Sequence, residues 1–176
     1  IGTAGLTKDG TGVLTLSSAN TYSGATAVNA GVVNIQNGSA LGSSSQTTVD
    51  NGATLQMQGG IAVGSLALRL YGAGVSSLGA LRNISGNNSW SGTITVLSAS
   101  RISSDAGVLT LSGANAISAT NMGVTFGGSG DVVVSGTITT GTGSLTKEGS
   151  GTLTLSGTNT YTGATTITAG TGVLGN

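Results

Sequence analysis

The chain has 176 residues, of which 33 are glycine and none is proline, cysteine or histidine; only 6% are charged and the net charge is zero. Its mean hydropathy of +0.29 excludes the charge-rich type of disordered chain. So neutral a surface offers no basic stripe for nucleic acid or for an anionic membrane. The lack of cysteine excludes disulfides and thiolate metal sites, and is compatible with export into an oxidising compartment.

No basic segment followed by an apolar core opens the chain, and no apolar run reaches the roughly 18 residues of a membrane-spanning helix. The chain begins at Ile1 and stops at a strand-like Gly-Val-Leu-Gly-Asn. We therefore expect it to be a piece of a longer protein that supplies further strands on both sides.

Short strands with one buried face are predicted throughout, because apolar and hydroxyl residues alternate with period two. In chain order the strands are expected at 13–16, 32–35, 54–57, 66–68, 94–96, 108–111, 124–126, 132–134 and 153–155. Three of these strands share a pattern of two inward leucines around one outward threonine: Leu14, Thr15 and Leu16; Leu109, Thr110 and Leu111; and Leu153, Thr154 and Leu155. Glycine between the runs is expected to make the corners, because it reaches positive φ at little cost.

One 26-residue segment occurs twice, at 6–31 and again at 145–170, and two degenerate copies are predicted at 78–96 and 108–119. Aligning the copies gives a column of Tyr22, Trp90, Ile117 and Tyr161, preceded by Asn20, Asn88, Asn115 and Asn159 and followed by Gly24, Gly92 and Gly163. The column spacings correspond to about three, one and two units of about 22 residues, which is typical of β-solenoid coils.

The repeat predicts how the strands are arranged. A single unit cannot bury its own apolar face, so neighbouring units stack and bury it together. We expect an all-β fold, a parallel β-helix of roughly eight coils about 38 Å long, forming one continuous domain over residues 1–176. A β-sandwich is the alternative, but it does not require the sequence to repeat in register.

The pattern LTKxGxGTLTLSGxNTYTGxTTIxAG at 145–170 resembles the autotransporter-associated β-strand repeat of Gram-negative passenger domains. The N-terminal copy departs from it at Val13, Ser18 and Ala27, and the middle copies keep only the Ser-Gly-Asn, aromatic and glycine core. The resemblance implies a right-handed β-helix in a protein that is secreted or displayed at the outer membrane of a Gram-negative bacterium.

Catalysis is not expected. Some β-helices cleave polysaccharides with clustered carboxylates, but the acids here are scattered: Asp9, Asp50, Asp105, Asp131 and Glu148. Asp9 and Glu148 occupy the same repeat position beside Lys8 and Lys147, which predicts a solvated turn pair and not an active site. The absence of histidine removes the commonest general base and metal ligand. A polysaccharide-acting enzyme remains a remote alternative.

No metal or cofactor is predicted. The segment Gly127 to Asp131 is similar to the calcium-binding nonapeptide of β-rolls, yet it lacks one residue before the aspartate and occurs once, which favours a plain glycine turn. Ice binding is another remote alternative, because Thr15, Thr110 and Thr154 recur as outward residues, but Asn83 is expected to interrupt their row.

The aromatic column could stack on sugars or pack over a corner, and the interchange of Tyr, Trp and Ile favours packing. The asparagines are expected to bond turn backbone or to stack as a ladder.

We therefore predict a non-enzymatic stalk segment that supports stepwise folding and display, each coil offering an edge to the next. The alternative is an adhesin segment that binds a cell-surface glycan or protein through the rod face. The expected partners are adjacent coils of the parent chain, with head-to-tail self-association at open ends; no nucleic acid and no membrane insertion are expected.

Overall fold

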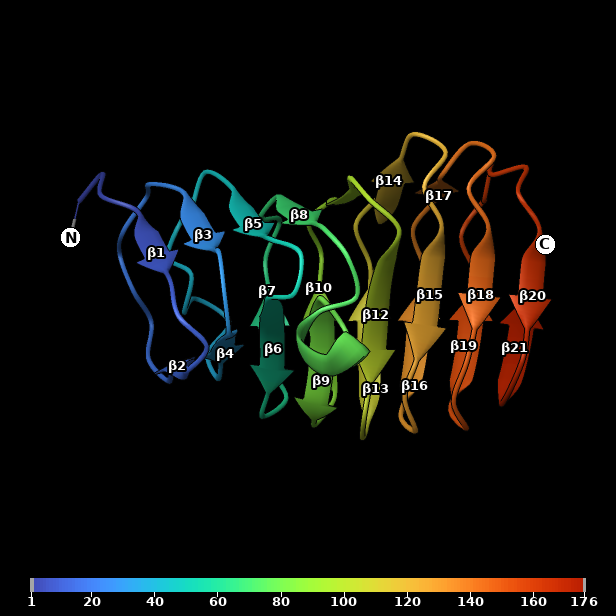
Figure 1. The fold of residues 1–176 in the computed structure, drawn as a ribbon, viewed down its shortest axis with the longest axis horizontal. Coiled ribbons are helices and arrows are strands. Elements are labelled where there is room, and N and C mark those ends of the chain that lie inside the picture. The colour runs from blue at the N-terminus through green and yellow to red at the C-terminus, as the bar shows by residue number, and fades with distance from the viewer. Residues whose placement is uncertain (1, 176) are drawn as a thin grey trace.

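The computed structural model describes residues 2–175, which form a rod of short parallel strands wound into about eight coils (Figure 1). The termini lie at opposite ends of the rod. Each coil contributes to two or three parallel sheets, which we call faces A, B and C. The predicted all-β parallel solenoid is confirmed.

The strands of each face hydrogen-bond in order along the rod. Face A contains β1 (Leu6–Lys8), β3 (Thr26–Val28), β5 (Thr47–Val49), β8 (Leu68–Leu70), β11 (Ile94–Val96), β14 (Ile117–Ala119) and β17 (Ile138–Thr139). Face B contains β2 (Val13–Leu16), β4 (Val32–Ile35), β6 (Thr54–Gln58), β9 (Leu81–Ser85), β12 (Ser100–Ser104), β15 (Val124–Gly127), β18 (Leu145–Lys147) and β20 (Thr165–Ile167). Face C contains β7 (Ala62–Val63), β10 (Asn88–Trp90), β13 (Val108–Leu111), β16 (Asp131–Val134), β19 (Thr152–Leu155) and β21 (Thr171–Leu174).

Coil length varies along the rod. Paired residues in successive coils lie as close in sequence as Val13 and Val32, and as far apart as Val63 and Trp90. The extra residues lie at corners. The largest excursion visible in Figure 1 carries the short 3-10 helix η1 (Val75–Ser77) and projects in front of β9.

The core runs inside the coils as one cluster of buried apolar side chains. Leu109, Leu111, Leu153 and Leu155 are buried, whereas the threonines between them are not, as the alternation predicted. Leu14 and Leu16 point the same way but are half-buried, because β2 belongs to the first coil and is covered on one side only.

The two strong copies of the repeat occupy different faces of the rod. In the N-terminal copy the LTK strand β1 lies on face A and β2 on face B, whereas in the C-terminal copy the LTK strand β18 lies on face B and β19 on face C. Face A contains seven strands, from β1 to β17, and the second copy begins with the next strand, β18, which lies on face B. The same sequence therefore builds the same local structure at either position.

In each copy a loop takes the third side of the coil in place of a strand. In the C-terminal copy this loop, residues 156–164, lies over β17, where the backbone N–H of Thr160 donates to the carbonyl of Ile138. In the N-terminal copy the corresponding loop, residues 17–25, is covered by residues 36–46.

Candidate functional site

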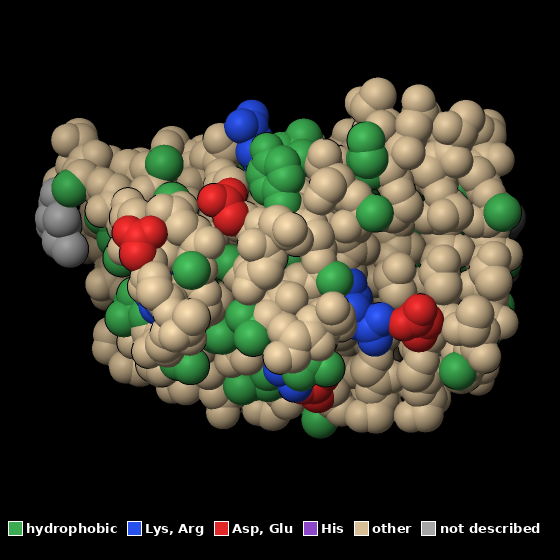
Figure 2. Space-filling view, viewed as in Figure 1, with side chains coloured by type: hydrophobic (Ala, Val, Ile, Leu, Met, Phe, Trp, Pro, Cys, Tyr) green, Lys and Arg blue, Asp and Glu red, His purple; other side chains and the backbone are tan. Residues whose placement is uncertain are grey.

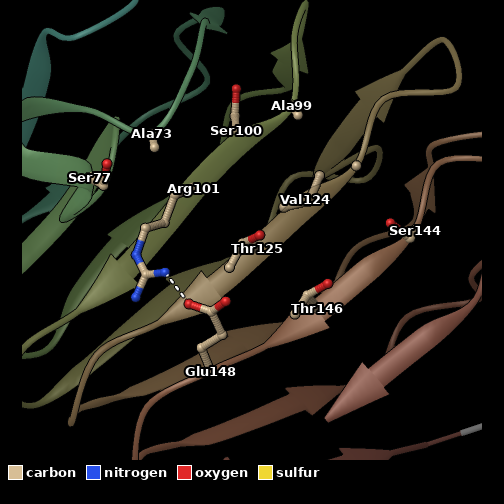
Figure 3. A pocket seen from close by; sticks show the side chains of 11 residues that line it. Ala73, Ser77, Ala99, Ser100, Arg101, Val124, Thr125, Ser144, Thr146 and Glu148 are labelled. Carbon is tan, nitrogen blue, oxygen red and sulfur yellow. Dashed lines mark hydrogen bonds and ion pairs between the residues drawn. The ribbon is translucent and has the colours of Figure 1, made fainter. Parts of the chain in front are cut away.

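A shallow groove of about 330 Å³ lies on the outer side of face B. Its floor is formed by the outward residues of three adjacent strands, Arg101 on β12, Thr125 on β15 and Thr146 on β18, and Figure 3 shows them side by side. Ala73 and Ser77, from the excursion that carries η1, form one wall. The lining is rich in hydroxyl groups and contains no aromatic side chain.

The wall is an inserted loop, residues 71–80, held in an unusual backbone conformation. Five of its residues have positive φ: Gly72, Gly74, Ser76, Ser77 and Gly79. Serine reaches this region only at a cost, so the surrounding contacts must hold it there. Thr54 supplies two of them, since its hydroxyl accepts from the N–H of Val75 and donates to the carbonyl of Gly79, each at 2.9 Å.

An ion pair crosses the groove. Nη1 of Arg101 lies 2.5 Å from Oε2 of Glu148, which follows β18 two strands away. The guanidinium passes over β15 at Gly127, where an added Cβ would collide with it. Nε of Arg101 is buried without a hydrogen-bond partner. The groove is thus polar and locally neutral, and it could hold an uncharged, hydrogen-bonding ligand in an extended form.

The lysine of the repeat has a structural role that was not predicted. The acids beside the two lysines, which were predicted as a solvated turn pair, are exposed at Asp9 and partly exposed at Glu148. Lys147 is 2% exposed and its side chain points inward, at the register position of Phe126. Its ammonium donates to the carbonyls of Glu148, Gly149 and Ala169 at 2.6, 2.8 and 3.4 Å. Burial lowers the pKa of Lys147, and the nearby charge of Arg101 lowers it further.

Lys8 makes the equivalent bonds to Asp9, Gly10 and Ala30 in the N-terminal copy. Sequence reasoning missed this role, although the signal was present. In Leu-Thr-Lys the alternation places the lysine on the inward side together with the leucine. Each lysine therefore ties its own turn to the next coil.

The acids do not converge on a common site. Asp9 accepts from the side-chain amide of Asn29 at 2.8 Å, and Asp105 pairs with Arg82. Oδ1 of Asp131 accepts from the backbone N–H of Thr152 at 2.8 Å, so this carboxylate bonds the turn of the next coil. Within residues 2–175, no group of three or more acids could hold a metal ion.

The predicted aromatic column does not exist as one structural column. Trp90 lies in β10 of face C and pairs with Val63 and Leu111, whereas Ile117 lies in β14 of face A and pairs with Ile94. Tyr22 and Tyr161 lie in loops that precede β3 and β20, on different faces. The alignment failed because it matched two strand residues, on different faces, to two loop residues.

These side chains nevertheless serve packing. Trp90 and Tyr22 are buried, and Trp90 donates from Nε1 to the carbonyl of Leu66 at 3.1 Å. Tyr22 bonds Thr26 and Tyr161 bonds Thr165 through their hydroxyls at 3.0 and 2.8 Å. Burial raises the pKa of Tyr22. A sugar-stacking surface formed by this column is therefore contradicted.

The asparagines of the repeat bond mainly to backbone. Nδ2 of Asn20 donates to the carbonyl of Ala40, and Oδ1 of Asn88 and of Asn159 accepts from the N–H of Ile61 and of Ile138, respectively. Asn115 instead accepts from the hydroxyl of Thr139. Among the described residues, none of the four bonds to another of the four, so they form no ladder.

The repeat glycines are needed because the coils pack closely at these positions, and not because the backbone there has a positive φ. At Gly24, Gly92 and Gly163 the backbone φ is not in the left-handed region, but an added Cβ would collide with the backbone of the preceding coil. The predicted role of positive φ holds at other corners, such as Gly10 and Gly149, which follow the two lysines.

The expected threonine row is also absent. Thr110 and Thr154 lie on face C with Val133 between them, while Thr15 lies on face B. Asn83, which was expected to interrupt the row, is buried inside the rod. These threonines therefore do not form the flat row that an ice-binding face would need.

Three segments of the chain, residues 6–35, 104–121 and 145–171, match the family described as passenger-associated-transport-repeat. The chain is also similar to the adhesin BmaC autotransporter of Brucella suis biovar 1 (strain 1330), with 40% identity over 80 residues, 42% of this chain. It spans 2% of that relative's length. No solved structure matches the chain.

The predicted copies at 6–31, 108–119 and 145–170 lie entirely within the matched segments, whereas the copy at 78–96 lies outside them. The matched segments are similar to the transport repeats of autotransporter passengers, and this similarity is consistent with a secreted or cell-surface location in a Gram-negative bacterium. Across residues 2–175 no helix has the length and apolar character needed to cross a membrane.

Proposed function

We propose that this chain, as a segment carrying passenger repeats, acts as a non-enzymatic stalk that holds a more distal region of a surface protein away from the cell. The continuous core carries this proposal, because one cluster of buried side chains extends from Val28 to Leu155 without a break between coils. The outer surface is suited to such a role. Figure 2 shows a face covered mostly by uncharged polar side chains and backbone, with few charged groups.

The stack also explains how such a stalk would fold outside the cell. Every coil ends in strand edges with free hydrogen-bonding groups, on which the next coil can form. Folding can then proceed coil by coil, without a long-range contact that must wait for the whole chain. Stepwise folding of this kind requires no external energy source.

A register-preserving deletion tests the stalk. Ile94 and Ile117 pair in neighbouring coils, so removing residues 94–116 joins Thr93 directly to the equivalent strand of the next coil. We expect a folded rod shorter by about 4.8 Å, one strand spacing, in small-angle scattering. The control deletion, residues 94–105, removes part of a coil and should unfold the rod around it. A compact particle, or equal disruption by both deletions, would contradict the proposal.

An adhesive rod face is the second candidate, and the groove on face B favours it. The inserted loop at 71–80, which has a strained backbone, forms one wall of the groove. Strained backbone conformations often occur at binding sites. The similarity to a protein named as an adhesin is consistent with this candidate.

Filling the groove separates the two candidates. Thr125→Trp would occupy the groove floor, and Thr48→Trp places the same bulk outward on β5 of face A as a matched control. Binding of the purified chain to glycan arrays and to cultured cells is measured. Binding that is lost only in Thr125→Trp supports the adhesin, whereas no binding by the native chain supports the stalk.

A further inference from the structure

The chain contains two Asn-Gly pairs, Asn37 with Gly38 and Asn51 with Gly52. An asparagine before glycine can lose ammonia without an enzyme, because glycine has no side chain that hinders attack of its backbone nitrogen on the asparagine amide. By sequence the two pairs are equivalent candidates for this deamidation. Their surroundings in the rod are different, and the difference decides which of them reacts.

The pair at Asn51 is free to react. Asn51 and Gly52 are both exposed. Gly52 has a φ of 82°, and an added Cβ there would meet no atom within 4 Å, so its backbone can move without displacing a neighbour. Within residues 2–175, the N–H of Gly52 donates to no backbone carbonyl. The attacking nitrogen is therefore available.

The pair at Asn37 is held in place. Oδ1 of Asn37 accepts from the N–H of Ser39 at 2.8 Å, which fixes the side-chain amide. Gly38 lies against a neighbouring coil, where an added Cβ would collide with the carbonyl of Ala62. Ring closure at this pair would break the hydrogen bond to Ser39 and move closely packed backbone. We therefore expect Asn37 to react slowly.

The corner at Asn51 joins β5 to β6, and its backbone length is fixed by packing. The N–H of Ala53 donates to the carbonyl of Asp50 at 2.9 Å, and Ala53 is 0% exposed. The next residue, Thr54, begins β6 and pairs with Val32 of the preceding coil. An extra backbone atom between Asp50 and Ala53 would therefore displace the start of β6.

This corner also supports the inserted loop at 71–80, which forms one wall of the groove on face B. The hydroxyl of Thr54 bonds Val75 and Gly79 of the loop, each at 2.9 Å. The side chain of Asn51 lies against the same loop, since an added Cβ at Gly72 would collide with its Oδ1. A change at Asn51 thus reaches the loop directly at Gly72 and also through Thr54.

We propose that Asn51 is a self-modification site whose conversion to isoaspartate releases the inserted loop. The backbone nitrogen of Gly52 attacks Cγ of Asn51, and the new C–N bond closes a succinimide ring. The bond from Cγ to the amide nitrogen breaks, and this nitrogen leaves as ammonia with the proton of the Gly52 nitrogen. Water then opens the ring. Addition of water at Cγ gives aspartate, and addition at the main-chain carbonyl carbon gives isoaspartate.

Isoaspartate has the larger effect on the loop, because it adds one carbon atom to the backbone of the corner. Since Ala53 is buried, the added length displaces Thr54 and weakens its two bonds to the loop. Aspartate leaves the backbone length unchanged and adds only a negative charge beside Asp50. The modification depends neither on the stalk role nor on ligand binding in the groove.

Peptide mapping by mass spectrometry tests the site. The whole chain is incubated at physiological temperature and mildly alkaline pH, and fragmentation distinguishes isoaspartate from aspartate. Asn51 should convert first and Asn37 about tenfold more slowly, because its hydrogen bond and packing add to the barrier. In the chain unfolded by urea the two rates should become similar. Equal rates in the folded chain, or a difference that persists in urea, would overturn the assignment.

Hydrogen exchange tests the effect on the loop. In the isoaspartate fraction of the aged chain the amide of Val75 should lose protection, whereas the amides of β16 should keep theirs. Asn51→Ser has no side-chain amide and should keep the protection of Val75 through ageing. Asn37→Ser is the matched control and should lose it as the native chain does. Unchanged exchange of Val75 in the isoaspartate fraction, or an equal loss in Asn51→Ser, would overturn the release of the loop.

Discussion

The ammonium of Lys147 donates a hydrogen bond to the carbonyl of Ala169, which lies 22 residues later in the next coil. Lys8 makes the same bond to Ala30 on a different face of the rod. The lysine of this repeat is therefore a structural element that links coils, and its position is specified by the motif and not by the face.

Replacing Lys147 with Met should lower the free energy of unfolding by about 1–3 kcal/mol, because three carbonyl groups lose a charged donor. Lys8→Met is the matched control and should cost less, since Lys8 is only half-buried and water can replace its ammonium. Urea unfolding measures both. An equal loss at the two positions would contradict the role of burial.

The lowered pKa of Lys147 leads us to expect that the stability of the rod depends on pH. Burial lowers the pKa of folded Lys147 below its usual 10.5, so between the two values the unfolded chain binds more protons than the folded one. The free energy of unfolding should then rise with pH through that window. The rise is measured as the difference between the native chain and Lys147→Met in melts at increasing pH. A difference that falls with pH would contradict the direction of the shift.

Leu155→Ala should cost about 2–5 kcal/mol, as expected for a large-to-small change in a packed core. Leu16 holds the equivalent repeat position but is half-buried in the first coil, so Leu16→Ala should cost less. Thermal and urea unfolding of the two variants check this. If Leu155→Ala caused no loss, the inward orientation of the strand would be wrong.

Gly92→Ala should destabilise the rod by about 1–3 kcal/mol or more, because the new methyl group would collide with the carbonyl of Leu66. Gly64→Ala is the control, since an added Cβ there meets no atom within 4 Å and φ is not positive. It should be neutral or slightly stabilising. Similar melting temperatures for both variants would show that close coil packing is not the reason for Gly92.

The pair formed by Arg101 and Glu148 should contribute little. In a double-mutant cycle with Arg101→Gln and Glu148→Gln, the coupling energy should be no more than about 1 kcal/mol, because both groups reach solvent. It should decrease as salt is added. A larger, salt-independent coupling would mean that the pair is more strongly desolvated than its exposure indicates.

Removal of calcium should leave stability unchanged. The carboxylate of Asp131 already accepts the N–H of Thr152, so it serves the backbone of the next coil. Melting temperatures in EDTA and in added Ca²⁺ should therefore coincide. A temperature that falls in EDTA and recovers with Ca²⁺ would restore the β-roll interpretation of this turn.

Most of the fold could be predicted because its signals are local. Alternation over a few residues placed Leu109 and Leu155 inward, and the repeat indicated stacking. The roles of Asn and Gly were predicted only in part. At Gly92 the constraint is the backbone of Leu66, which is 26 residues away in sequence, so no local pattern reveals it.

The groove and the wrong aromatic column have a common cause. Both depend on which strands become neighbours, and this depends on the number of residues between corners. The inserted loop at 71–80 lengthens one coil, so a fixed period of 22 residues misplaces Trp90 relative to Tyr22. The pair of Arg101 and Glu148 follows from the same register and could not be inferred from residues 47 apart.

The sequence by itself determined the strand type, the inward side of the three Leu-Thr-Leu strands, the coiled architecture and the resemblance of the repeat to a family, because each depends on period-two alternation or on a motif within one coil. Only the tertiary structure decided the face on which each strand lies, the partners of Lys147 and the shape of the groove on face B. The physical reason is that the face on which a residue lies depends on the number of residues in every corner before it. Hydrogen bonds and packing join residues of neighbouring coils, so they depend on all of those corner lengths together.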